Sequence, residues 1–84
     1  MNSPDYWERR KKLEELEEAL ARTHRNISWL REVMAELERL GEADSAAVVG
    51  ANIENFEQLN RTYRARRDLV LEELAIISVG ALPD

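Results

Sequence analysis

Apolar residues recur three and four positions apart through the first half of the chain. This spacing puts them on one face of an α-helix, in the a and d positions of a heptad repeat. No glycine or proline interrupts the pattern between Pro4 and Gly41. We therefore expect one long helix over about residues 4–40. Its a and d positions are Tyr6, Arg9, Leu13, Leu16, Leu20, Thr23, Ile27, Leu30, Met34 and Leu37.

Signals for helix ends flank this segment. Ser3 can cap the helix, Pro4 suits its first position, and Asp5 complements the positive end of the helix dipole. Gly41 can adopt the left-handed conformation that closes a helix. A turn is expected over 41–45, and a second helix, capped by Asp44 or Ser45, over about 46–79. A short tail at 80–84 contains Pro83.

The second helix carries a heptad repeat that fits the first. Its a and d positions are Ala46, Val49, Ile53, Phe56, Asn60, Tyr63, Arg67, Val70, Leu74 and Ile77. When the chain folds back at the turn, one register pairs Leu30 with Phe56 and Met34 with Ile53. The sequence therefore predicts an all-α fold with a single domain over residues 1–84. We expect an antiparallel two-helix coiled-coil hairpin, completed as a four-helix bundle by oligomerisation.

Polar residues interrupt both repeats at the same level. Thr23 lies opposite Tyr63, Asn60 opposite Ile27, and Arg67 opposite Leu20. A polar residue at an a position can fix the alignment of the helices at some cost in stability. Alternatively, the interruption forms a small polar site midway along the hairpin. The Arg67 guanidinium is expected to reach Glu17.

A second apolar face lies outside the seam, at the c and g positions. In an antiparallel pair the g positions of both helices fall on the same side, next to c. A chain of 84 residues buries only a modest core, and such a patch is rarely left exposed on a monomer. We expect this face to mediate self-association, with Trp29 as an anchor. Its residues are Ala19, Trp29, Val33, Leu40, Val48, Leu59, Leu69 and Ile76.

Basic residues gather around the middle of the hairpin. They suggest a minor alternative function, an RNA-binding hairpin dimer. Their positions ring the hairpin, acidic residues lie nearby, and the net charge is −5, so nucleic-acid binding is disfavoured. The residues are Arg22, Arg25, Arg61, Arg64 and Arg66.

The remaining sequence offers no catalytic motif. It has no nucleophile–base pair, phosphate-binding loop or metal-ligand spacing, and the single histidine, His24, lacks carboxylates one turn away. We expect no enzymatic activity, no cofactor and no metal.

The same features bear on location and partners. The absence of cysteine, of a signal peptide and of a membrane-spanning stretch favours an intracellular, cytoplasmic location. The leading interpretation is a non-catalytic structural or scaffold protein that binds itself. The alternative is a small adaptor, inhibitor or antitoxin-like binder of another protein.

Overall fold

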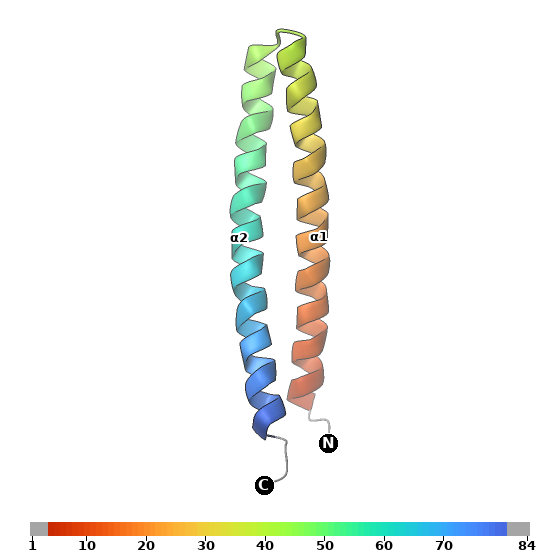
Figure 1. Ribbon diagram of the computed structural model, residues 1–84, viewed down its shortest axis with the longest axis vertical. Coiled ribbons are helices and arrows are strands. Elements are labelled where there is room, and N and C mark those ends of the chain that lie inside the picture. The colour runs from red at the N-terminus through yellow and green to blue at the C-terminus, as the bar shows by residue number, and fades with distance from the viewer. Residues whose placement is uncertain (1–3, 81–84) are drawn as a thin grey trace.

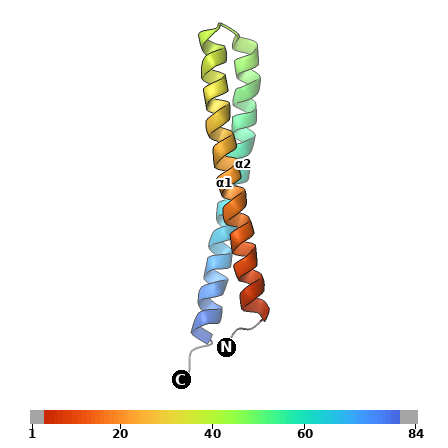
Figure 2. The same cartoon turned by 90° about the vertical axis from the view of Figure 1, so that its right-hand side faces the viewer.

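The computed structural model describes residues 4–80, which form two long antiparallel helices. Helix α1 spans Pro4–Arg39 and helix α2 spans Ala43–Gly80. They lie side by side in a rod with principal extents of 66 × 15 × 14 Å (Figure 1). The start of α1 and the end of α2 lie at the same end of the rod, and the helices cross along its length (Figure 2). The all-helical hairpin is therefore confirmed.

Helix α1 begins and ends with the predicted signals. Pro4 occupies the first helical position and Asp5 lies in the first turn, whereas Ser3 is outside the described residues. At the other end Gly41 has a φ of 76°, the left-handed conformation that favours glycine. The Gly41 N–H donates to the Glu38 carbonyl at 3.1 Å and the Glu42 N–H to the Leu37 carbonyl at 2.9 Å. This pair of bonds is a Schellman motif, which satisfies carbonyls at the helix end.

Helix α2 begins earlier than the sequence predicted. Its first residue is Ala43, and the Ala46 N–H already donates to the Glu42 carbonyl at 2.9 Å. Asp44 and Ser45 lie inside the first turn, so the prediction that one of them caps the helix is wrong. Asp44 instead places a carboxylate near the positive end of the dipole. The Schellman bonds make the turn compact enough for the helix to start at once.

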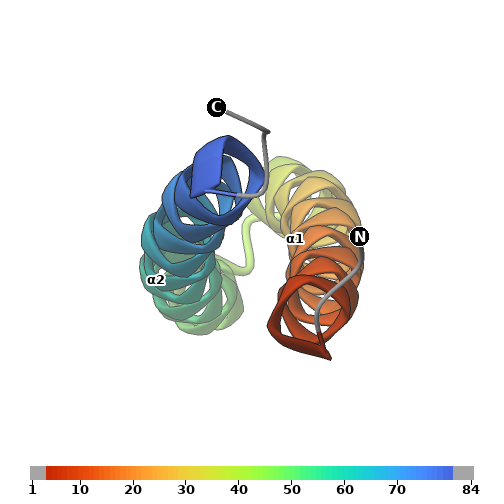
Figure 3. The same cartoon turned by 90° about the horizontal axis from the view of Figure 1, so that it is seen from below.

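The predicted seam is the buried face of the hairpin. No a or d position in either helix is exposed; each is buried or half-buried. Towards the termini Leu13, Leu16, Val70 and Leu74 form a core cluster, flanked by half-buried tyrosines at 6 and 63. Burying a leucine or valine side chain stabilises the fold by about 1.5–3 kcal/mol. Figure 3 shows the two helices side by side in a view from the end of the rod where the chain begins and ends.

Contacts across the seam confirm the register. Arg31 and Glu57, both at e positions, form an ion pair at 3.0 Å. Close to the turn, a Cβ placed on Gly50 would lie 3.5 Å from the Met34 sulfur. The e positions of the two helices therefore share one long edge of the hairpin, and the g positions share the other. We call these the e edge and the g edge, and the c positions adjoin the g edge.

Candidate protein-interaction site

Large hydrophobic side chains are exposed beside the g edge, as the sequence predicted. Trp29 is 62% exposed, Leu69 56% and Ile76 67%. Leu59 is the least exposed of them, at 38%, and Val33 is only half-buried. The packing of α1 against α2 leaves these apolar residues partly or largely open to solvent. They are Trp29, Val33, Leu40, Val48, Leu59, Leu69 and Ile76.

Ala19 does not belong to this exposed set. It was expected on the second apolar face, but it is 8% exposed and forms part of the core. Its neighbour Leu20, at an a position, is only half-buried. Leu20 faces the half-buried Arg67 across the seam. The methyl side chain of Ala19 is small enough to be buried at a g position next to the seam.

The apolar residues are unevenly divided between the helices. On α1 they lie in the half near the turn, at Trp29, Val33 and Leu40. On α2 they extend towards the termini, through Leu69 and Ile76. Near the turn α2 adds Val48 and Leu59, which the register places level with Leu40 and Trp29. The exposed apolar side chains of the g edge therefore come from both helices near the turn and from α2 alone near the termini.

A groove opens on the g edge in the half near the termini. It encloses about 370 Å³, and its apolar lining comes from Leu16, Leu69 and Val70. The polar lining comes from side chains on both helices: Glu8, Arg9, Lys12, Arg66 and Glu73. An apolar floor with charged walls is typical of a surface that receives another helix.

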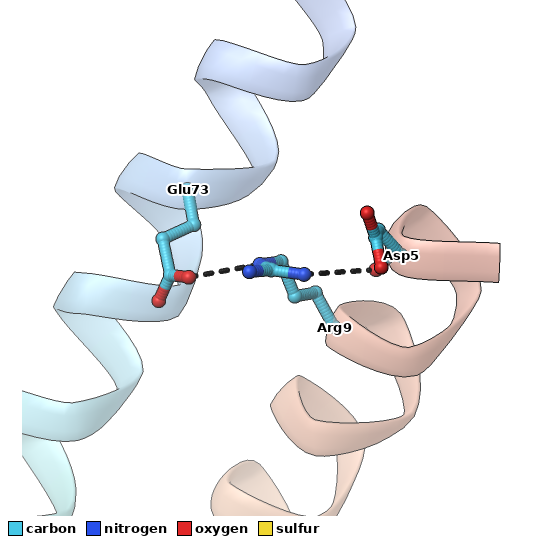
Figure 4. Close-up of polar contacts among 3 residues, drawn as sticks. All are labelled: Asp5, Arg9 and Glu73. Carbon is cyan, nitrogen blue, oxygen red and sulfur yellow. Dashed lines mark hydrogen bonds and ion pairs between the residues drawn. The ribbon is translucent and has the colours of Figure 1, made fainter. Parts of the chain in front are cut away.

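Two of the residues that line this groove, Arg9 and Glu73, form an ion pair between the helices. Arg9 Nε donates to Glu73 Oε2 at 2.8 Å, and Arg9 Nη1 donates to the Asp5 carbonyl at 3.4 Å (Figure 4). Arg9 occupies a d position, and the heptad repeat alone does not name its partner. The predicted register could have found the pair, because it places a g-position glutamate diagonally opposite this arginine.

Some exposed hydrophobic residues lie away from the g edge. Leu71 is 45% exposed at an e position, Trp7 is 54% exposed, and Val79 is 68% exposed. The Trp7 ring meets Tyr6 edge-on, with centroids 5.4 Å apart. Most, though not all, of the large exposed hydrophobic residues within residues 4–80 therefore lie beside the g edge.

The predicted nucleic-acid residues do not form one surface. Arg22 pairs with Glu18 at 3.2 Å, and Arg61 donates to Gln58 Oε1 at 2.7 Å. Arg64 lines a pocket on the e edge, whereas Arg66 lines the groove on the g edge. Arg25 is exposed at an outer f position. A continuous phosphate backbone would meet these groups on different sides of the rod.

The polar residues at the middle of the seam are accommodated in three different ways. Thr23 is 4% exposed, and its hydroxyl donates to the Ala19 carbonyl of its own helix at 2.8 Å. Asn60 is 9% exposed and lines the e-edge pocket. Arg67 donates to Asp68 Oδ1 at 3.2 Å, so the prediction that it reaches Glu17 is wrong. Asp68 is the next residue on the same helix, so the Arg67 side chain can bond it without crossing the seam.

Two further observations limit the chemistry of the described chain. Within residues 4–80 no three histidine or carboxylate side chains converge in a way that would hold a metal ion. Neither α1 nor α2 contains a stretch long and apolar enough to cross a membrane.

The chain was compared with protein families, characterised proteins and solved structures. No family profile, no characterised protein and no solved structure matches it. Functional inference therefore rests on the geometry of the hairpin itself.

Proposed function

We propose that this protein is a non-catalytic assembly protein that binds a second copy of itself along the g edge. The observation that carries the proposal is the exposure of Trp29, Leu69 and Ile76, each more than half open to solvent. Burying apolar surface contributes about 25 cal/mol for each Å² removed from water. Two hairpins packed through this edge would form a four-helix bundle.

The slenderness of the hairpin supports self-association. Two helices bury only one stripe each, so a rod 15 × 14 Å across has little interior beyond the seam. A second hairpin supplies the missing layer and turns c and g residues into core residues. Trp29 is suited to anchor such an interface, since tryptophan combines a large apolar area with few rotatable bonds.

Sedimentation velocity tests the proposal. The wild-type chain should show a mass that is a multiple of 9.7 kDa and that falls on dilution. Trp29→Glu combined with Leu59→Glu should sediment as a monomer, because burying two carboxylates in an apolar interface is costly.

A matched control separates the loss of the apolar face from the added charge. Ala21→Glu with Ala65→Glu adds the same two charges at exposed b and f positions, and this variant should assemble like the wild type. A wild-type chain that stays at 9.7 kDa at high concentration would contradict self-association. It would favour the alternative, an adaptor, inhibitor or antitoxin-like binder of a different protein.

A further inference from the structure

An open pocket on the e edge, midway along the hairpin, combines positive charge with a buried amide. It encloses about 280 Å³. Three arginines and one carboxylate line it, which makes it locally basic in a chain of net charge −5. The lining comes from both helices and consists of His24, Ile27, Arg31, Glu57, Asn60, Arg61 and Arg64.

Asn60 lines this pocket and carries an unpartnered amide. The residue is 9% exposed, and its side chain has no hydrogen-bond partner within residues 4–80. Every fully buried polar side-chain atom of the described residues has a partner, so the unpartnered Asn60 amide keeps some contact with solvent, and Asn60 lines this pocket. An amide on a mostly buried residue that keeps a free N–H can donate to a ligand oxygen.

The single carboxylate of the pocket is already engaged. Glu57 accepts from Arg31 Nη2 at 3.0 Å, so these two charges offset one another. Arg61 donates to Gln58 with one Nη at 2.7 Å, and its guanidinium retains further N–H groups. Arg64 forms no ion pair with any described residue. Arg61 and Arg64 therefore supply the uncompensated positive charge.

We propose that this pocket binds a small multivalent phosphate anion. The planar guanidinium fork of arginine matches two phosphate oxygens, and the Asn60 amide can donate to a third. His24, which faces Arg64 across the seam at a matching e position, adds a further ring N–H donor. The site lies on the opposite edge from the self-association surface and does not depend on it.

Calorimetric titration with pyrophosphate tests the site. The wild-type chain should bind in a saturable manner, with one anion for each chain. Arg64→Gln should weaken binding about tenfold or more, since it removes a charged hydrogen-bond donor. Arg66→Gln is the matched control: it removes the same charge two residues away on the g edge and should change the dissociation constant by less than about twofold.

A second variant should strengthen binding. Glu57→Gln removes the only carboxylate of the pocket and releases Arg31, so pyrophosphate should bind several times more tightly. Circular dichroism confirms that each variant keeps its helical content, and the side-chain NH₂ resonance of Asn60 should shift on titration. Absence of saturable binding would overturn the proposal. Equal weakening by Arg64→Gln and Arg66→Gln would do so too, because diffuse charge would then explain the binding.

Discussion

The two long edges of the hairpin differ although they flank the same seam. On the e edge, Arg31 and Glu57 bridge the helices and a basic pocket lies beside them. On the g edge, Trp29 and Ile76 expose large apolar surfaces, and the charged pair of Arg9 and Glu73 lies only near the termini. Charged side chains are well solvated in water, whereas burying exposed apolar side chains against a partner is favourable. This difference supports the proposal that a second hairpin packs on the g edge and not on the e edge.

The largest expected effect is on the free energy of unfolding, which should fall much more for a substitution in the seam than for one on an edge. Leu74→Ala, at a position 7% exposed, should cost about 2–5 kcal/mol in the free energy of unfolding. Ile76→Ala, at a position 67% exposed, should cost less than about 0.5 kcal/mol in dilute solution, where the hairpin is monomeric. Urea denaturation at two protein concentrations measures both. If Ile76→Ala also becomes destabilising at high concentration, the g edge is buried on assembly.

The next effect compares the edges through two leucines on α2. Leu69 is 56% exposed beside the g edge and Leu71 is 45% exposed on the e edge. Leu69→Glu should weaken self-association by about 2 kcal/mol, as an interface anchor does. Leu71→Glu should leave it unchanged. Sedimentation equilibrium gives both association constants, and equal losses would show that assembly does not select an edge.

A smaller effect is expected where polar residues enter the seam. Arg67 is half-buried, and among residues 4–80 it pairs only with its neighbour Asp68, at 3.2 Å. Arg67→Leu should leave the free energy of unfolding unchanged or raise it by up to about 1 kcal/mol. The leucine can pack against Leu20 in the seam, and the substitution leaves no buried group without its partner. Thermal melting measures this. A drop of several degrees would show that Arg67 contributes contacts that a leucine cannot replace.

The smallest effect should come from the ion pair on the e edge. The Arg31 and Glu57 side chains are 60% and 37% exposed, and exposed pairs contribute about 0.2–1 kcal/mol. A double-mutant cycle with Arg31→Ala and Glu57→Ala should give a coupling energy in that range, and it should shrink as salt is added. A coupling well above this range would mean that the pair holds the hairpin together.

The sequence predicted the hairpin because two independent repeats agree on one register. Leu16 and Val70, which this register places at the same level of the seam, lie in the same core cluster. The exposed residues beside the g edge were also predicted, since they follow from that register. Its g position led to the prediction that Ala19 lies on the exposed face, but it is buried, because its side chain is small enough to enter the seam.

Details that depend on side-chain length and turn geometry were harder to predict. Arg67 donates to the adjacent Asp68 and not to Glu17 across the seam, because a heptad position does not fix the conformation of a long arginine side chain. The early start of α2 follows from backbone hydrogen bonds around Gly41. The shape of the e-edge pocket is set by the conformations of its arginine side chains. The heptad repeat predicts only the position of the pocket along the hairpin.

Trp29 fluorescence tests the central claim most directly, because it reports on the g edge itself. Trp7→Phe leaves Trp29, which is 62% exposed in the single hairpin, as the only tryptophan. At high protein concentration its emission should be blue-shifted and protected from acrylamide, and both properties should disappear on dilution into monomer. If sedimentation shows assembly while Trp29 stays accessible to acrylamide at every concentration, the g edge is not the interface and the account is wrong.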